Sequence, residues 1–478
     1  MKRRPAKRRW FARRETFSPD PTIQKSLRHS IYDGVAYSVM TGGGESYFSA
    51  YALLLRATTP QIGALASVPP LLASWMQLVS AWVGRRTGQR RNIIVFGALV
   101  QASALIPIIV LPAVFPDYAV ELLLVCAVLY FSGPNLASPQ WGSLMGDLVP
   151  ENRRGRFFGL RTRFASLTGF TSLIVGGLTL HAFDTAGVAY WGFVAIFSAA
   201  CLARLVSAYH LSRIYDPPGH VAALETPWHT DVWKRMRSSP LVRFSIFYAC
   251  MQIAVAIASP FYVVYMLRDL QFTYLEFMLN TSASVFMQFL TLNRWGRVSD
   301  LFGNRLIMVT TGSMVLLLPL LWIVSTDFWY LLAVQALSGF MWAGFSLSTT
   351  TFVFDLTPPA RRATLMATHN TLAAFGVFVG AMIGGYLGTH LPREMTLFGD
   401  GHQWMTALYG VFAISALARL IVALLFLPRL REVRRVRPMS MSGLIFRVTR
   451  FHPVSGLIFD IVGTRRKARN RRPDEHSD

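Results

Sequence analysis

Long apolar stretches recur along the chain at a length that suits membrane crossing. A bilayer core of about 30 Å needs about 20 apolar residues in an α-helix. Scanning for such runs predicts about twelve helical spans, six in each half of the chain. They lie near 31–55, 61–83, 92–115, 119–145, 157–180 and 188–208, and near 241–267, 274–294, 304–326, 328–353, 363–388 and 404–428.

The same pattern divides the chain into five parts. Two six-helix bundles, 31–208 and 241–428, are separated by a polar central loop at 209–240. A basic tail precedes the first bundle at 1–30, and a second basic tail follows at 429–478. We therefore expect an all-α membrane protein made of two six-helix bundles.

The two predicted bundles share sequence features at a nearly constant spacing. Such internal repeats are the best sequence pointer to transporter architecture. The matched pairs are GRRTGQRR (84–91) with SDLFGNRL (299–306) and FSAACLARLV (197–206) with FAISALARLI (412–421), both 215 positions apart, and DLVPENRRG (147–155) with DLTPPARRA (355–363), 208 apart. The second bundle is thus predicted to be a diverged copy of the first.

Composition supports a membrane protein and excludes a soluble one. Apolar residues make up 53% of the chain and charged residues only 15%, where soluble domains carry roughly 25% charged residues. The net charge of +23 could suggest nucleic acid, but the Lys and Arg residues gather in the two tails and in alternate turns. Only Arg56, Arg268 and Arg393 lie on the opposite side. By the positive-inside rule, we predict an inner (plasma) membrane protein with both termini cytoplasmic and no nucleic-acid partner.

No motif for catalysis, metal binding or a cofactor stands out. The chain has no G-x-S-x-G, no H-E-x-x-H and no phosphate-binding Walker loop. Its three cysteines, Cys126, Cys201 and Cys250, lie in apolar runs without metal-ligand spacing. We therefore expect neither an enzyme nor a bound cofactor, and no ATP to drive the protein.

The segment from Gly296 to Arg305, in the predicted turn after the eighth span, carries a specific pattern: Gly296-Arg297-Val-Ser-Asp300-Leu-Phe-Gly303-Asn-Arg305. It resembles the G-x-x-x-D-x-x-G-x-R loop motif of the major facilitator superfamily. The resemblance implies that the Asp300 carboxylate engages a helix N-terminus and basic partners, and so keeps the cytoplasmic face closed in one access state.

The first-half copy of this motif departs from the family pattern, with Ala81 in the glycine position and Arg85 in the aspartate position. Basic pairs and acidic residues in the matched turns are expected to form ion pairs between the halves that break when the inner gate opens. The predicted cytoplasmic gate consists of Gly296, Arg297, Asp300, Gly303, Arg305, Arg86, Gly88, Arg90, Asp147, Arg153, Arg154, Asp355, Arg361 and Arg362.

Glu45 is the predicted coupling residue. It lies near the middle of the first span, directly after three glycines in MTGGGESYF. A carboxylate at membrane depth is costly and is by default a functional hypothesis. Glycines weaken a helix, and broken helices at the membrane midplane often line substrate sites. The alternative is a structural carboxylate hydrogen-bonded between helices, or one nearer the outer face.

Amide side chains inside other spans are candidates to line a substrate pathway. Interhelical amide hydrogen bonds that only hold helices together are the competing interpretation. The predicted pathway residues are Gln77, Asn135, Gln140, Gln252, Gln288 and Gln335, in addition to Glu45.

Two further features have membrane explanations. Arg204 and Arg419 occupy matching positions in the sixth and twelfth spans, where we expect them to reach out to the lipid headgroups. In the C-terminal tail, SGLIFRV (442–448) and SGLIFDI (455–461) precede a basic run. This pattern favours a segment lying on anionic membrane lipids over a disordered tail.

The sequence therefore predicts a secondary transporter that moves a small-molecule substrate of unknown identity, driven by protons or another coupling ion. Two alternatives stay open on the same fold: a non-transporting sensor or assembly protein, and a lipid flippase. Fold does not fix function, so the substrate cannot be named from the sequence.

Overall fold

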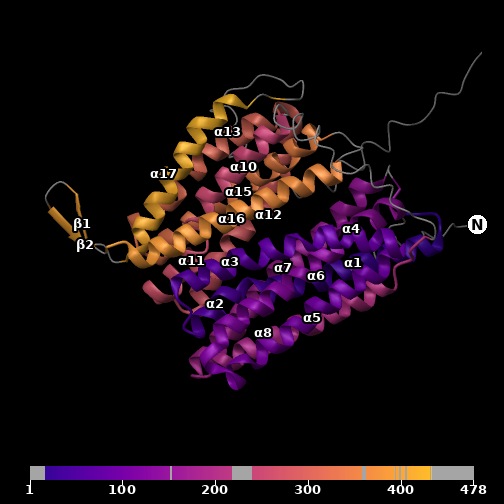
Figure 1. Cartoon of the computed structure of the whole chain (residues 1–478), viewed down its shortest axis with the longest axis horizontal. Coiled ribbons are helices and arrows are strands. Elements are labelled where there is room, and N and C mark those ends of the chain that lie inside the picture. The colour runs from indigo at the N-terminus through magenta and orange to yellow at the C-terminus, as the bar shows by residue number, and fades with distance from the viewer. Residues whose placement is uncertain are drawn as a thin grey trace, which may run out of the picture.

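The computed structural model describes residues 17–150, 153–217, 240–357, 362–392, 394–397, 400–403, 406–430 and 432. Nearly all of these residues are helical, and the long helices lie roughly side by side (Figure 1).

The first half of the chain forms six long helical rods, two of them interrupted. In chain order its elements are α1 (Pro21–Gly43), η1 (Glu45–Tyr47), α2 (Phe48–Leu54), α3 (Thr59–Ser74), α4 (Met76–Thr87), α5 (Arg90–Val114), η2 (Pro116–Tyr118), α6 (Ala119–Leu148), α7 (Arg154–Thr185) and α8 (Ala189–Ser212).

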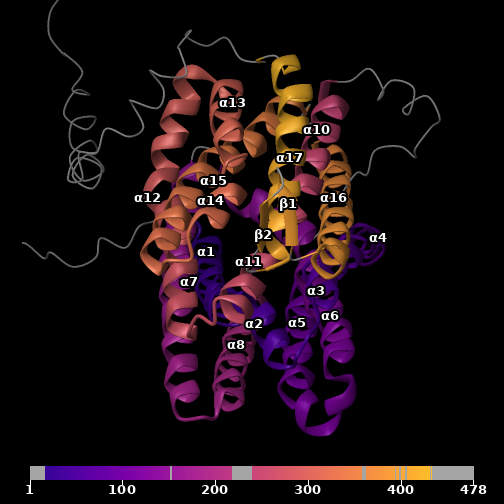
Figure 2. The same cartoon turned by 90° about the vertical axis from the view of Figure 1, so that its left-hand side faces the viewer.

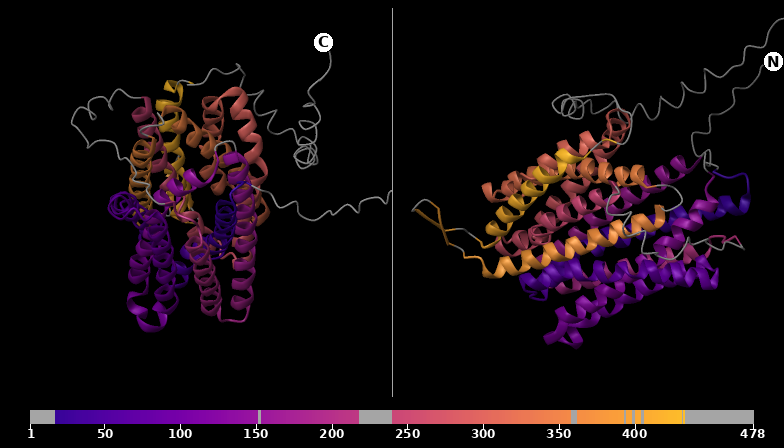
Figure 3. Two further views of the ribbon diagram at one scale, coloured as in Figure 1. Left: turned by 90° about the vertical axis from the view of Figure 1, so that its right-hand side faces the viewer. Right: turned by 45° about the horizontal axis from the view of Figure 1, so that its top comes forward.

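The second half repeats this layout. Its elements are α10 (Pro240–Ala256), α11 (Phe261–Val264), the π-helical turn η4 (Tyr265–Asp269), α12 (Tyr274–Phe302), α13 (Asn304–Val315), α14 (Leu318–Val324), α15 (Phe328–Leu356), α16 (Arg362–His390), β1 (Glu394–Leu397), β2 (Asp400–Gln403), α17 (Leu408–Phe426) and η6 (Leu427–Arg429). The strands β1 and β2 pair as an antiparallel hairpin, which the sequence analysis did not predict. The hairpin projects beyond the helices (Figure 3).

Every predicted span has a helical counterpart in the part of the chain that the structure describes. By length and composition alone, ten helical stretches are suited to cross a membrane. The two long rods outside that set are α1–α2 and α12, which carry more polar residues. The rod α1 begins at Pro21, ten residues before the predicted span, because the Asp20 carboxylate caps it by accepting from the Thr22 amide (2.7 Å). A capped helix can extend beyond its apolar section.

The predicted repeat is confirmed in the geometry of two turns. Gly88 ends α4 with φ +62°, and Gly303, 215 positions later, ends α12 with φ +86°. Glycine is suited to such left-handed conformations because it has no Cβ atom. Both halves thus end the corresponding helix with a glycine at positive φ.

A second pair of turns shows the same spacing. Arg56 (φ +63°) and Gln271 (φ +52°) are the non-glycine residues with positive φ in the described ranges, and they too are 215 positions apart. Each is followed two residues later by a threonine that begins a helix with a capping box, Thr58 before α3 and Thr273 before α12. The copied architecture therefore extends to backbone detail that the sequence comparison did not use.

Glycines let the helices of each half pack at close range. On α16, a Cβ atom at Gly380 or Gly384 would overlap the carbonyl oxygen of Ile253 or Ile257 on the neighbouring rod. Between α5 and α6, Gly97 and Gly133 face each other in the same way. Small residues at helix contacts are the usual device where lipid gives no hydrophobic drive for association.

The two halves form separate bodies in Figure 2, where α5, α6 and α8 of the first half lie below α13 and α17 of the second. We call the end at which α1 begins and α17 finishes the tail end. The opposite end, where α2, α11 and the hairpin lie, is the far end; it is on the left in Figure 1.

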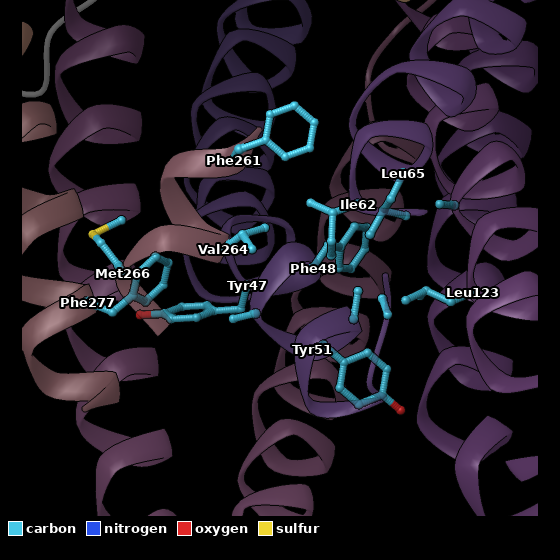
Figure 4. Close-up of a cluster of buried hydrophobic side chains, with 14 of the residues drawn as sticks. Tyr47, Phe48, Tyr51, Ile62, Leu65, Leu123, Phe261, Val264, Met266 and Phe277 are labelled. Carbon is cyan, nitrogen blue, oxygen red and sulfur yellow. The ribbon is translucent and has the colours of Figure 1, made fainter. Parts of the chain in front are cut away.

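One hydrophobic core joins the halves, and it lies toward the far end. It combines first-half side chains such as Tyr47 and Phe48 with second-half side chains such as Phe261, Val264 and Phe277, all fully or almost fully buried (Figure 4). We call this cluster the far-end seal. The remaining clusters, which include the tail-end core of each half, draw their buried residues from a single half. The halves thus pack against each other at the far end, while at the tail end each half packs around its own core.

We expect Gly380→Ala to lower the melting temperature of the detergent-purified protein. The new methyl group would overlap the Ile253 carbonyl, and such overpacking costs about 1–3 kcal/mol. The matched control is Gly142→Ala, because a Cβ atom there meets nothing within 4 Å. Equal melting temperatures for the two variants would show that the close contact between α10 and α16 is absent.

Candidate functional site

Glu45 lies at a break in the first rod, as its three glycines predict. The helix α1 ends at Gly43 and the short helix η1 begins at Glu45. The amide of Gly44 still donates to the Met40 carbonyl (2.9 Å). A Cβ atom on Gly42 would overlap the carbonyl oxygen of Gly169 on α7. The glycine run therefore serves two purposes, close packing against α7 and interruption of the helix.

The Glu45 side chain is half-buried and points between η1 and α6. Its Oε2 atom accepts a hydrogen bond from the Tyr130 hydroxyl (3.0 Å). Tyr130 is fully buried, and its ring packs edge-on against Phe48 (centroids 4.9 Å apart). The carboxylate is thus held by a rigid neutral donor inside the first half.

A buried charged network lies closer to the tail end of the same half. The Asp33 carboxylate, 3% exposed, forms an ion pair with Arg161 of α7 (3.1 Å) and accepts from the Ser207 hydroxyl (2.7 Å). Arg204 donates in turn to that hydroxyl (2.7 Å). Four side chains from α1, α7 and α8 thereby form one hydrogen-bonded chain, which we call the Asp33 network.

The Asp33 network corrects the prediction for Arg204. This arginine does not reach the lipid headgroups, since only 3% of it is exposed. Its guanidinium lies over the Tyr37 ring (5.0 Å to the centroid), where a cation–π contact adds to the hydrogen bond. The inner face of α8 packs on α1, so the side chain turns inward toward an acid.

Arg419 in the second half is also buried, at 2% exposure, so the prediction for it was wrong as well. It donates to the backbone carbonyls of Val315 (3.0 Å) and Val255 (3.5 Å). The position that matches Asp33, 215 residues later, is Tyr248. The two halves therefore share the buried arginine but not the acid.

Helix periodicity was the signal that could have revealed this arrangement. Asp33, Tyr37, Thr41 and Glu45 are spaced by four residues and so fall on one stripe of the first rod. Of these four residues, only Glu45 was predicted to be functional; Asp33 lies at the edge of the predicted span 31–55. The structure lines up Asp33, Tyr37 and Glu45 toward α6 and α8.

The predicted pathway amides in the first half bond to one another or to backbone. Gln77 donates to the side-chain Oδ1 of Asn135 (2.8 Å), and Gln140 donates to the backbone carbonyl of Ser80 (2.8 Å). Both contacts join α4 to α6, so they hold these two helices together. They do not reach Glu45.

The second-half amides are spread over three helices. Gln252 on α10, Gln288 on α12 and Gln335 on α15 are all half-buried, and Gln288 donates to the Ser284 hydroxyl of its own helix (3.4 Å). Two buried amides were missed by the sequence analysis, Gln101 and Asn280. Both are fully buried, and their side-chain atoms have no hydrogen-bond partner among the described residues.

At the tail end, the predicted gate residue Arg90 is buried and forms two ion pairs. Its guanidinium contacts the carboxylates of Asp147 (2.7 Å) and Asp216 (3.1 Å). These contacts join the start of α5 to the end of α6 and to the segment after α8. They lie within the first half.

The second half has an equivalent arrangement. Arg305, at the position matching Arg90, donates through its side chain to the Leu430 carbonyl, and its amide donates to Glu432 (2.8 Å). Asn304 donates to the Asp355 carboxylate (2.9 Å). Each arginine thus ties its turn to the segment after the last helix of its own half.

The remaining gate residues are distributed around these turns. Arg154 donates to the Gly146 carbonyl (2.7 Å) and Arg86 stacks on Trp82 (4.3 Å), while Arg153, Gly296 and Arg297 lie in the same turns or beside them. The ion pairs predicted between halves stay a prediction, because the gate contacts found lie within one half. Arg361 and the side chains of Asp300 and Arg362 lie outside the described residues.

These features define a class of protein: a membrane protein of two repeated six-helix bundles, each with charged side chains buried inside it. The sequence profile of the Major Facilitator Superfamily matches the chain over residues 34–255 and 244–459. The chain belongs to this superfamily of membrane transporters. No curated protein matches its sequence closely enough to count as a relative.

Several solved transporters are similar in fold. A mutant form of the nucleoside transporter NupG has a TM-score of 0.66 at 15% identity, covering 85% of this chain and 100% of its own. A D-xylose-proton symporter has a TM-score of 0.65 at 14% identity, covering 87% and 99%. A bacterial homologue of the iron transporter ferroportin, in an inward-facing state, has a TM-score of 0.61 at 14% identity, covering 85% and 98%. At these identities the likeness concerns the fold.

We expect Asp33→Asn to destabilise the protein strongly. The change removes the carboxylate that Arg161 contacts directly and that Arg204 reaches through Ser207. Breaking a buried pair by removing one partner costs about 3–5 kcal/mol. The melting temperature of purified protein measures the loss, with Asp117→Asn at an exposed position as control.

The double variant Asp33→Asn/Arg161→Met provides a second check. It removes both members of the ion pair, so it should be more stable than Asp33→Asn alone. Purely additive losses would contradict the buried pairing.

Proposed function

We propose that the protein is a secondary transporter that moves a small solute by alternating access. The observation that carries this proposal is the far-end seal, the single core shared by both halves, together with independently packed tail-end cores. Two rigid bodies joined at one end can exchange that contact for a contact at the other end. Rocking of two bundles about a central site is the behaviour expected of such repeats.

Orientation follows from charge. The described chain begins and ends at the tail end, and the basic residues Arg90 and Arg154 lie there, so this end faces the cytoplasm of an inner (plasma) membrane in our proposal. The described conformation is then closed toward the outside.

Proton coupling through Glu45 is the second element of the proposal. A half-buried carboxylate at a helix break, bonded to the neutral Tyr130 hydroxyl, can gain or lose charge without breaking an ion pair. A charge at membrane depth is costly. The protonation state of Glu45 therefore affects how the first rod packs against its neighbours.

A thermal-stability screen of the purified protein should identify the substrate class. A ligand that binds only the folded state raises the melting temperature. Sugars, nucleosides, organic acids, amino acids and lipids are compared at an acidic and a near-neutral pH. Stabilisation by lipids alone would favour a flippase over a solute carrier, and no stabilisation together with no flux would favour a sensor.

We expect Glu45→Gln to abolish pH-driven solute accumulation in proteoliposomes while leaving expression and melting temperature nearly unchanged. Glutamine keeps the hydrogen bond to Tyr130 but cannot exchange a proton. The matched control is Glu121→Gln, which neutralises an exposed carboxylate at the start of α6. Normal accumulation in Glu45→Gln would rule out coupling through this residue.

A disulfide between positions 59 and 388 should block transport reversibly. A Cβ atom built on Gly388 would lie 3.9 Å from the Thr59 Cβ, inside the range of about 3.5–4.5 Å for a disulfide. Oxidation of Thr59→Cys/Gly388→Cys, in a background without the three native cysteines, would lock the far end closed. We expect flux to disappear on oxidation and to return on reduction.

The single variants Thr59→Cys and Gly388→Cys are the controls, since neither can cross-link within one molecule. Undiminished flux through a fully oxidised double variant would overturn alternating access at this seal.

A further inference from the structure

Arg268 connects the two halves at the rim of the far-end seal. It lies in η4, two residues after the seal residue Met266. Its Nη1 atom donates to the Thr59 hydroxyl (3.0 Å), at the first residue of α3 in the other half. Thr59 is buried, at 4% exposure. A cation of the second half is thus hydrogen-bonded to the first residue of a helix in the first half.

Residues of the second half hold the same guanidinium in position. Its Nε atom contacts the Asp269 carboxylate (2.8 Å), and Asp269 also accepts from the Thr406 hydroxyl (2.6 Å) just before α17. A continuous chain therefore runs from α3 through η4 to the start of α17. Because Asp269 orients the arginine, residues of the second half determine the position from which Arg268 contacts Thr59.

These two charges are an addition to the repeated architecture. The residues 215 positions earlier, at the same place before the left-handed turn of the first half, are Leu53 and Leu54. The pair also breaks the charge pattern of this end, where few basic residues occur. A charged pair is not required before the equivalent left-handed residue, since Arg56 in the first half follows leucines at these positions.

The exposure of Arg268 suits a contact that must open. Its side chain is 46% exposed, and the pocket of about 520 Å³ beside it is lined by Thr59, Asp269, Gly388, Thr389 and Thr406. Once separated from Thr59, the guanidinium would be hydrated at once. A solvent-exposed charged contact contributes little free energy. It can therefore favour the far-end-closed conformation without preventing the far end from opening.

We propose that Arg268, oriented by Asp269, is the latch that holds the far end closed by bonding to Thr59. The proposal rests on the alternating-access function above, and it adds a gating residue that lies at the opposite end from the family's loop motif. Loss of the latch shifts the population toward far-end-open molecules.

The test measures how often the seal opens. Val264 is fully buried in the seal, and cysteine is close to it in size, so Val264→Cys reports opening when a membrane-impermeant maleimide is added from the far side. The native cysteines are replaced in this background. We expect Arg268→Gln to raise the labelling rate by roughly two- to tenfold, the range for losing one exposed charge-assisted contact.

Thr59→Val removes the acceptor and should raise the rate to a similar degree. The double variant should label no faster than either single variant, because both remove one interaction. Arg56→Gln is the matched control: it removes an exposed arginine at this end, and glutamine already occupies the equivalent left-handed position at 271. Its labelling rate should equal that of the parent.

The outcomes separate the latch from the transport function. Equal labelling in the parent and Arg268→Gln, with flux still blocked by the 59–388 disulfide, would overturn the latch and leave alternating access intact. An increase in Arg56→Gln as large as in Arg268→Gln would also overturn the latch, since general loss of charge would explain it. No labelling in any variant would show that the far end never opens, and both proposals would fail.

Discussion

The far-end seal determines the conformation of this protein. In lipid, apolar side chains gain little from packing together, because the surrounding chains are as apolar as they are. Aromatic rings such as Tyr47 and Phe277 instead fit closely across the two halves, their centroids 6.2 Å apart. Glycines on α3 and α16 let the backbones approach beside them, as Gly63 does against Ala381. The connection between the halves therefore depends on close packing of complementary surfaces. Such a contact can be replaced by a different packing of the two halves without a large loss of hydrophobic free energy.

The buried charged groups have different partners in the two halves. The first half buries a balanced ion pair between Asp33 and Arg161 and places Glu45 further along the same rod. The second half buries Arg419 against backbone carbonyls and has no acid at the matching position. Duplication preserved the fold and the buried arginine, while the acids differ. The buried carboxylate of Asp33 and the half-buried carboxylate of Glu45 therefore distinguish the first half from the second.

The sequence predicted the helices and turns well, for a simple physical reason. A membrane helix must satisfy its own backbone, so a run of about 20 apolar residues has few alternatives to a helix. Gly88 and Gly303 marked turns because a left-handed conformation favours glycine. The helix break at Glu45 followed from the three glycines before it. These features are local, and local chemistry is what a sequence shows directly.

The direction in which side chains point was decided only by the tertiary structure. The helices α8 and α17 are mostly apolar, and an arginine near the end of such a helix can either extend to the headgroups or turn toward the protein. Arg204 and Arg419 were therefore placed wrongly at the headgroups. Likewise, Asp33 and Arg161 lie 128 positions apart, and their pairing depends on how α1 packs against α7. The sequence by itself determined the helices, their repeat and the family; the packing of helices decided which charges meet, because that choice depends on contacts between distant segments.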